Sequence, residues 1–163
     1  MTSLDLLIEK ILDREGGVAD VGDGKGVTRY GQTPAWLAEF HLPVPSGRAQ
    51  AAANYKTWLS LVGLTDVISP GDNLADILFD IGVMSTALKA IKALQAALKI
   101  PVDGILGPTT QRMLALADRR RLAFEVIAWD MTYQGRVITN NPQRAMYAEG
   151  WATRMADHVR RLA

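Results

Sequence analysis

The sequence predicts a mainly α protein of the α+β class, in which a small β-hairpin lobe near the N-terminus packs on a helical lobe. Most of the chain consists of segments whose apolar residues recur every three or four positions, the spacing of one buried helix face. One glycine-rich segment, residues 18–30, instead holds turn formers and short β-prone pieces. The 163 residues suffice for one well-cored domain, or for one large and one small domain.

The first helix is expected to begin after Ser3 and to end at Glu15. Ser3 can cap it, and its apolar residues share one face, namely Leu4, Leu7, Ile8 and Ile11. Gly16 and Gly17 supply a left-handed exit from the helix. The chain therefore enters the predicted hairpin with a carboxylate in the last turn of the preceding helix.

Prolines and glycines divide the rest of the chain into helices. Thr33 is an N-cap followed by proline, which predicts a short helix ending near Phe40. The segment 74–99 has the longest apolar pattern, and we expect it to form one central buried helix. A helix from residue 109 to 133 is expected to bend near Asp118. The remaining helices are predicted at residues 48–61 and 143–162.

The composition excludes several classes of function. The chain has no cysteine, which excludes disulfides, cysteine-ligated zinc and a cysteine nucleophile. Its two histidines, His41 and His158, are too few for the histidine-rich zinc sites of wall peptidases, and we expect no cofactor. A formal net charge of +1 does not favour nucleic-acid binding. Residues 112–163 carry a net charge of +4, which suits either contact with an anionic polymer or a solvated helix face.

Glu15 is the main candidate for chemistry. Cleavage of a glycosidic bond needs a carboxylic acid that gives a proton to the leaving oxygen, and a group that stabilises positive charge or activates water. Glu15 stands at the C-terminal end of its helix, where unpaired carbonyl groups disfavour a negative charge. Taken alone, a surface residue at a helix end is the alternative. The glycines and polar residues that follow it favour catalysis.

A second carboxylate and a hydroxyl follow Glu15 in the glycine-rich segment. Asp23 is the preferred second carboxylate, because the neighbouring glycines let the backbone approach a substrate closely. Asp20 is the competing candidate, and a turn-forming aspartate is the alternative. Thr28 can hold a water molecule through its hydroxyl. Tyr30 and Trp36 offer aromatic faces for a sugar, although core packing is at least as good an interpretation of Trp36.

Five motifs occur in order along nearly the whole chain. The first is Glu-Gly-Gly at residues 15–17, followed by Asp-Gly-Lys-Gly-Val-Thr-Arg-Tyr-Gly at residues 23–31. The others are Tyr55 with Trp58, Phe79-Asp80 with Leu94-Gln95, Asp-Gly-Ile-Leu-Gly-Pro-Thr at residues 103–109, and Gly150-Trp151 with Arg154. Together they resemble the motifs of the phage and bacterial N-acetylmuramidases of glycoside hydrolase family 108.

This resemblance implies a lysozyme-like fold and hydrolysis of the β-1,4 bond between N-acetylmuramic acid and N-acetylglucosamine in bacterial peptidoglycan. Glu15 matches the catalytic acid, and the order Glu15, Asp23, Thr28 is also similar to the catalytic trio of phage lysozymes. Residues 1–99 are then the catalytic part. Residues 100–163 are a helical, peptidoglycan-binding-like part, integrated with it into one compact domain. The residues expected to bind substrate are Tyr30, Asp20, Asp80 and Tyr55.

The chain departs from the family pattern at several positions. Lys25 stands where the first glycine of the usual pair occurs, and Gln32 replaces an apolar residue. Met84 and Thr86 occupy the positions of an asparagine and a glycine. Met84 therefore puts one expected substrate contact in doubt, but none of these changes removes the acid.

Two of the motifs have structural interpretations beside the functional ones. Asp80 lies in an apolar helix, so it is either a buried, hydrogen-bonded residue or a cleft residue facing Glu15, and we favour the structural role. The segment 103–109 either binds the cell wall or simply connects two helices, with glycines for positive φ and a proline at the first helical position.

The same resemblance predicts partners and location. The expected protein is an endolysin of a phage or phage-derived element, a monomer that acts on the cell wall after release by a holin-type partner. The N-terminus lacks the basic start of a signal peptide and no apolar run is long enough to span a membrane, so we expect synthesis in the host cytoplasm and no membrane insertion. The alternatives are a lytic transglycosylase that cuts the same bond, and a non-catalytic wall-binding module.

Overall fold

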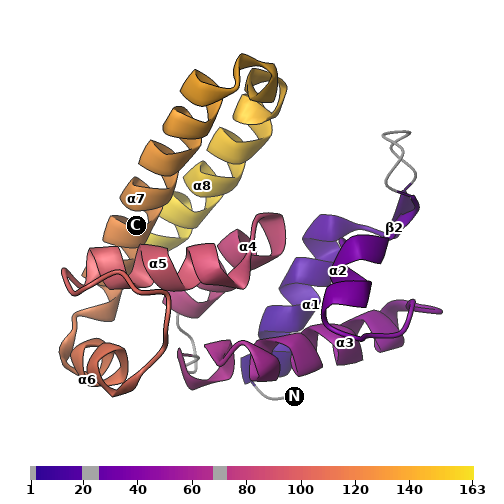
Figure 1. The fold of residues 1–163 in the computed structure, drawn as a ribbon, viewed down its shortest axis with the longest axis horizontal. Helices are drawn as coiled ribbons and strands as arrows, with labels where there is room; N and C mark the ends of the chain where they lie inside the picture. The colour runs from indigo at the N-terminus through magenta and orange to yellow at the C-terminus, as the bar shows by residue number, and fades with distance from the viewer. Residues whose placement is uncertain (1–2, 20–25, 68–72) are drawn as a thin grey trace. The chain divides into compact units, whose positions relative to one another are not determined.

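The computed structural model describes residues 3–19, 26–67 and 73–163 (Figure 1). The chain divides into two compact units, Met1–Pro70 and Gly71–Ala163. Both units are mainly helical, and the sheet among the described residues is one two-stranded antiparallel hairpin in the first unit. The mainly α fold class with a small hairpin near the N-terminus is therefore confirmed. The division lies after residue 70, whereas the sequence predicts parts of 1–99 and 100–163.

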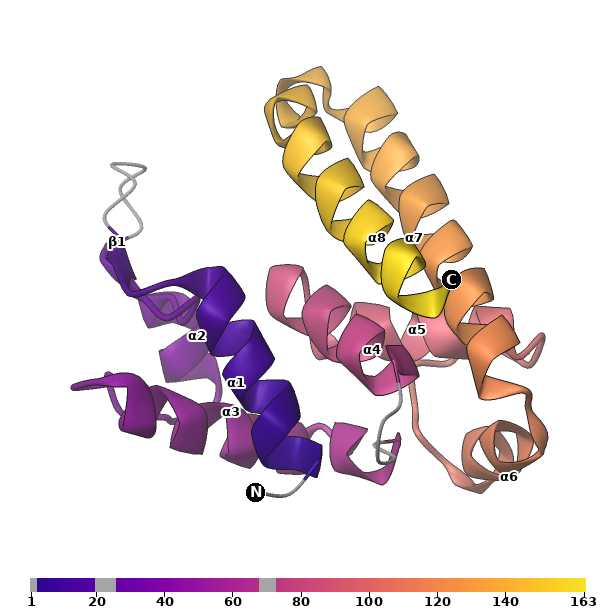
Figure 2. The ribbon, with the colours of Figure 1, turned by 180° about the vertical axis from the view of Figure 1, so that it is seen from behind.

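The first unit contains three α-helices around one core. Its elements are α1 (Ser3–Glu15), β1 (Val18–Ala19), β2 (Thr28–Arg29), α2 (Pro34–Glu39), α3 (Arg48–Leu61) and the 3₁₀-helix η1 (Leu64–Val67). α1 packs along α3 (Figure 2). The apolar face of α1 is buried, as the residue spacing predicts, through Leu7, Ile8, Ile11 and Leu12. The side chain of Thr33 accepts a hydrogen bond from the backbone N–H of Trp36 at 3.2 Å, which confirms the predicted cap of α2.

Aromatic rings fill the space between α2 and α3. The ring of Trp36 lies 5.6 Å from that of Tyr55 and 5.7 Å from that of Trp58, measured between centroids. Tyr55 and Trp58 are almost completely buried, and Trp36 is half-buried beside them. Trp36 thus packs in the core of the first unit, which is the structural alternative that the sequence left open.

The second unit is built on a helical hairpin. Its elements are α4 (Asn73–Met84), α5 (Ala87–Ala97), α6 (Pro108–Leu116), α7 (Arg119–Asn140), the 3₁₀-helix η2 (Pro142–Tyr147) and α8 (Ala148–Leu162). α7 and α8 run side by side, and both α4 and α5 pack against α7 (Figures 1 and 2). Because α4 and α5 pack against α7, they belong to the second unit.

The single helix predicted for residues 74–99 is wrong, because α4 ends at Met84 and α5 begins at Ala87. Thr86 has an extended backbone between them, and its side chain accepts a hydrogen bond from the backbone N–H of Lys89 at 3.1 Å. A threonine that caps the next helix competes with continuation of the previous one. The apolar pattern runs through this break because both helices bury residues in the same core.

The bend predicted near Asp118 is a complete break. The side chain of Asp118 accepts a hydrogen bond from the backbone N–H of Arg121 at 3.1 Å, so that it caps α7. α7 then continues to Asn140, beyond the end predicted at residue 133.

The segment 103–109 forms a tight turn that is organised by Gln95. The side-chain amide of Gln95 donates to the Asp103 carboxylate at 2.6 Å and to the Ile105 carbonyl at 3.0 Å, and its oxygen accepts from the Gly104 N–H at 2.8 Å. Gly104 has a φ of +81°, which glycine adopts readily. The Leu94-Gln95 motif and the segment 103–109 are therefore one hydrogen-bonded unit, and Pro108 opens α6 as predicted.

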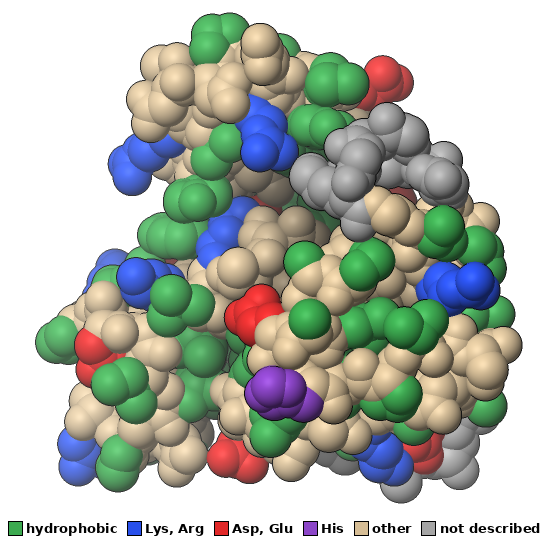
Figure 3. Space-filling model, turned by 45° about the vertical axis from the view of Figure 1, so that its right-hand side comes forward, with side chains coloured by type: hydrophobic (Ala, Val, Ile, Leu, Met, Phe, Trp, Pro, Cys, Tyr) green, Lys and Arg blue, Asp and Glu red, His purple; other side chains and the backbone are tan. Residues whose placement is uncertain are grey.

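The described surface mixes residue types. On the face drawn in Figure 3, hydrophobic side chains are interspersed with polar groups and with Lys and Arg. Among the described helices, none is long and apolar enough to cross a membrane.

Candidate functional site

Glu15 stands at the junction of α1 and the hairpin. α1 ends there because Gly16 takes a φ of +68°, in the left-handed region. The carbonyl of Gly17 then accepts a hydrogen bond from the N–H of Tyr30 at 2.7 Å. The two strands pair as Val18 with Arg29 and Ala19 with Thr28. The end of the helix is thereby tied to the residues that follow β2.

A tight turn after β2 lies directly against the Glu15 side chain. Arg29 and Gln32 exchange backbone hydrogen bonds at 3.1 and 2.9 Å, and the two residues between them have positive φ, 53° at Tyr30 and 78° at Gly31. A Cβ atom added to Gly31 would lie 2.8 Å from Cγ and 3.0 Å from Oε2 of Glu15. The half-buried carboxylate therefore sits on the backbone of this turn, at a position that only glycine leaves open.

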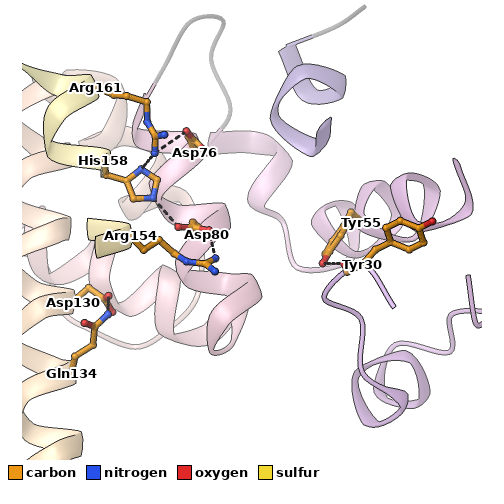
Figure 4. Close-up of polar contacts among 9 residues, drawn as sticks. All are labelled: Tyr30, Tyr55, Asp76, Asp80, Asp130, Gln134, Arg154, His158 and Arg161. Carbon is orange, nitrogen blue, oxygen red and sulfur yellow. Dashed lines mark hydrogen bonds and ion pairs between the residues drawn. The ribbon is translucent and has the colours of Figure 1, made fainter. Parts of the chain in front are cut away.

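Tyr55 of α3 holds the same turn from the core side. Its hydroxyl donates to the carbonyl of Tyr30 at 2.8 Å (Figure 4), and it would lie 2.7 Å from a Cβ at Gly31. The exposed fraction of Tyr55 is only 1%, so its ring has no face free for a sugar. Substrate binding by Tyr55 does not fit this burial. Its place in the structure is that of a residue that positions Tyr30 and Gly31 beside Glu15.

A buried pair of amides fixes the residue that follows the turn. The Gln32 side chain donates to the Ala51 carbonyl at 2.8 Å and accepts from the Asn54 side chain at 2.8 Å. Asn54 also donates to the Pro43 carbonyl at 2.8 Å. Gln32 occupies a position where the resembled family has an apolar residue, and its polar atoms are satisfied by α3. Sequence reasoning missed this role of Asn54, although an unexpected glutamine at an apolar position was the signal for a polar partner.

Of the other residues that the sequence predicts for this site in the first unit, Thr28 and Tyr30 lie within the described ranges, and Asp20 and Asp23 do not. Thr28 lies in β2, half-buried, opposite Ala19. Tyr30 is half-buried in the turn that contacts Glu15. Asp20 and Asp23 fall in residues 20–25, outside the described residues, as does Lys25. The structure thus brings Glu15 together with Tyr30, Gly31 and Tyr55.

Asp80 belongs to the second unit and is completely buried between α4 and α8. Its carboxylate contacts Arg154 at 2.9 Å and His158 Nε2 at 2.8 Å (Figure 4). The guanidinium of Arg161 contacts His158 Nδ1 at 2.9 Å, so Nδ1 is an acceptor and Nε2–H donates to Asp80. Substrate binding by Asp80 does not fit this arrangement, whereas the structural role favoured from the sequence does. The same network gives Arg154, the last residue of the terminal motif, a structural role.

Asp103 and Arg48 have shifted pKa values. The backbone N–H of Ile105 and the amide of Gln95 hold the pKa of Asp103 below its ordinary value of 3.8. The carboxylates of Glu9 and Asp13 raise the pKa of Arg48. Within the described ranges, no group of three His, Asp or Glu side chains is arranged to hold a metal ion.

The comparisons with known proteins bear on the fold. No protein-family model matches the chain, and no curated protein matches it. A solved structure of Brucella abortus SagA is similar, with a TM-score of 0.79 over 98% of this chain and 93% of that one. The two sequences are 19% identical. At this identity the likeness shows a shared fold, mainly helical with a small antiparallel hairpin.

Proposed function

We propose that this protein is a peptidoglycan glycosidase that hydrolyses the β-1,4 bond between N-acetylmuramic acid and N-acetylglucosamine, with Glu15 as the general acid. The observation that carries the proposal is the position of the Glu15 carboxylate. It lies at the end of a helix that Gly16 terminates, against the Tyr30-Gly31 turn. The motifs that resemble family 108 and the mainly α fold with its hairpin support the same activity.

The chemistry follows from what surrounds Glu15. A general acid must be held in one orientation to reach the leaving oxygen. The backbone of Gly31 and the Tyr55 hydroxyl bound the space beside the carboxylate. In this proposal Glu15 protonates the glycosidic oxygen. Asp23, with Asp20 as its competitor, stabilises the oxocarbenium-like transition state or activates water, and Thr28 orients that water.

The first test replaces the acid by its amide. Glu15→Gln keeps the shape of the side chain but has no proton to donate, so we expect the rate of lysis of a cell-wall suspension to fall roughly 10²–10⁴-fold. Turbidity measures the rate, and thermal unfolding checks that the variant is folded. Glu39→Gln is the matched control, because Glu39 is exposed at the end of α2. Equal lysis by wild type and Glu15→Gln would remove Glu15 as the acid.

The products separate hydrolysis from the nearest alternative. A lytic transglycosylase cuts the same bond with one acid/base glutamate and leaves an anhydro-sugar. Mass spectrometry of the released fragments is expected to find reducing-end N-acetylmuramic acid, and an anhydro product would assign the transglycosylase reaction instead. A wild-type protein that sediments with cell walls but never releases fragments would be a binding module.

A further inference from the structure

The second unit contains a cavity that the proposed chemistry does not use. It has a volume of about 180 Å³ and lies where α4, α5, α7, η2 and α8 meet. Its lining is mixed in character, with apolar, polar, charged and aromatic side chains, and the residues that matter below are Ser85, Lys89, Asp130, Gln134, Arg144 and Trp151. A cavity of this volume, below the roughly 300–1,000 Å³ of a site for a drug-sized molecule, can take one group of a larger ligand.

The floor of the cavity is polar but electrically neutral. Lys89 Nζ lies 2.6 Å from Asp130 Oδ1, and both side chains are nearly buried. The same ammonium group contacts Ser85 Oγ at 3.3 Å and the ring face of Tyr133 at 4.3 Å. The Gln134 amide donates to Asp130 Oδ2 at 2.5 Å, and the close-up view shows these two residues on α7 side by side (Figure 4). A floor of this kind suits hydroxyl or amide groups and disfavours an apolar ligand.

The rim carries a cation that the protein does not neutralise. Arg144 of η2 is exposed, and no carboxylate of the described residues pairs with it. Its guanidinium lies 5.9 Å from the ring of Tyr147, which restrains it. Since Lys89 and Asp130 cancel, Arg144 gives the lining a net positive charge. A planar guanidinium binds a carboxylate in a two-bond arrangement.

The remaining wall is an aromatic ring in a fixed orientation. Trp151 of α8 lines the cavity, and its ring stacks on Tyr147 with 5.9 Å between centroids and an interplanar angle of 28°. Because the Tyr147 ring contacts both Arg144 and Trp151, a cation and an indole lie at the same opening.

We propose that this cavity binds a carboxylate carried on a neutral sugar or peptide body, as found in the muramyl peptide unit of peptidoglycan, with the carboxylate on Arg144 and the body against Trp151. The identity of the ligand rests on the proposed function. The site is distinct from the segment 103–109, where the sequence resemblance suggests wall binding. It recognises a charged substituent of the glycan, whereas Glu15 acts on the bond between sugars.

The test compares two ligands that differ by one charge. The full chain carrying Glu15→Gln, which excludes turnover, is titrated with N-acetylmuramyl-L-alanyl-D-isoglutamine and with the same compound amidated at its free carboxylate. Nuclear magnetic resonance follows the indole N–H signals, and Trp151→Phe identifies that of Trp151. We expect the Trp151 signal to shift, and the acid to bind about tenfold or more tightly than its amide, since a hydrogen bond to a charged group contributes about 1.5–3 kcal/mol.

Variants separate the two contacts. Arg144→Gln is expected to bind acid and amide equally, and Trp151→Leu to bind both more weakly. Arg112→Gln makes the same change of charge at an exposed position of α6 outside the cavity, and should keep the preference for the acid. Equal affinity of the parent chain for acid and amide, an undiminished preference in Arg144→Gln, or an unshifted Trp151 signal would overturn the assignment.

The outcome is independent of the proposed catalysis. Lysis by the wild type without binding at Trp151 rejects the cavity and leaves the glycosidase intact. Selective binding by a chain that never cuts peptidoglycan rejects the glycosidase and leaves the cavity as a ligand site.

Discussion

The carboxylate of Glu15 owes its position to a residue that has no side chain. Gly31 faces it across the turn, and Tyr55 closes the same space from α3. Neither Gly31 nor Tyr55 carries out chemistry in the proposed reaction. Both nevertheless decide where the proton donor lies, because the space around the carboxylate is bounded by their atoms.

Gly31→Ala is expected to lower the rate of wall lysis by more than its loss of folding stability explains. The new Cβ would meet Glu15 Cγ at 2.8 Å and Tyr55 Oη at 2.7 Å, so the acid has to move, and alanine at a φ of 78° adds strain of about 1–2 kcal/mol. Lysis rate and urea unfolding are measured on the same preparation. Gly150→Ala is the control, since nothing lies within 4 Å of the added carbon. Full activity in Gly31→Ala would show that lysis does not require the observed position of Glu15 against Gly31.

At the scale of elements, caps decide where the helices of the second unit begin. Thr86 opens α5 and Asp118 opens α7, each through one side-chain hydrogen bond. The apolar periodicity does not predict these breaks, because it indicates which face of a helix is buried and not where the backbone changes direction. The turn at residues 103–109 is held in a similar way by side chains, chiefly those of Gln95 and Asp103.

Thr86→Ala is expected to destabilise the protein by about 1 kcal/mol, within a range of 0.5–2, because the Lys89 N–H loses the Thr86 hydroxyl at the start of α5 and keeps only the Thr86 carbonyl as acceptor. Thr132→Ala, inside α7, is the control, since its hydroxyl only bonds back to the Ala128 carbonyl of the same helix. The free energies of unfolding come from urea titrations. The interpretation of Thr86 as a cap fails if the two variants are equally stable.

The turn at residues 103–109 predicts a dependence on pH. The pKa of Asp103 is lowered in the folded state, so its ionised form stabilises the fold above the unfolded value of about 3.9, and this contribution is lost as the pH falls through the lower folded value. Asp103→Asn removes the titration. We expect wild type to be more stable than the variant near pH 6, with a difference that shrinks below pH ~4. A constant difference across that range in urea unfolding would contradict the assignment.

At the scale of the whole molecule, the second unit is held together by a buried ionic network as well as by apolar packing. The Asp80 carboxylate of α4 contacts Arg154 and His158 of α8. Arg161 contacts His158 and also lies 3.8 Å from the Asp76 carboxylate. Residues far apart in the sequence thus depend on one another for their polar partners. Removing the buried Asp80 carboxylate takes one partner away from both Arg154 and His158.

Asp80→Ala is expected to destabilise the protein by about 3–5 kcal/mol, the range for breaking a buried ion pair. Asp157→Ala removes an exposed pair with Arg160 and should change stability by about 0–1 kcal/mol. Chemical unfolding followed by circular dichroism compares the two. If Asp80→Ala is no less stable than Asp157→Ala, the network does not hold α4 to α8.

The sequence by itself determined the fold class, the bounds of α3, the hairpin, the cap at Thr33 and the proline that opens α6, because these depend on local periodicity and on residues next to each other. It also singled out Glu15 as the candidate acid. Only the tertiary structure decided that residues 73–97 belong with α7, that Tyr55 and Asp80 are buried, and that Gly31 and the Gln32–Asn54 pair shape the site. Those outcomes depend on which faces meet across long sequence separations, and a pattern along the chain does not specify the partner of a buried polar group.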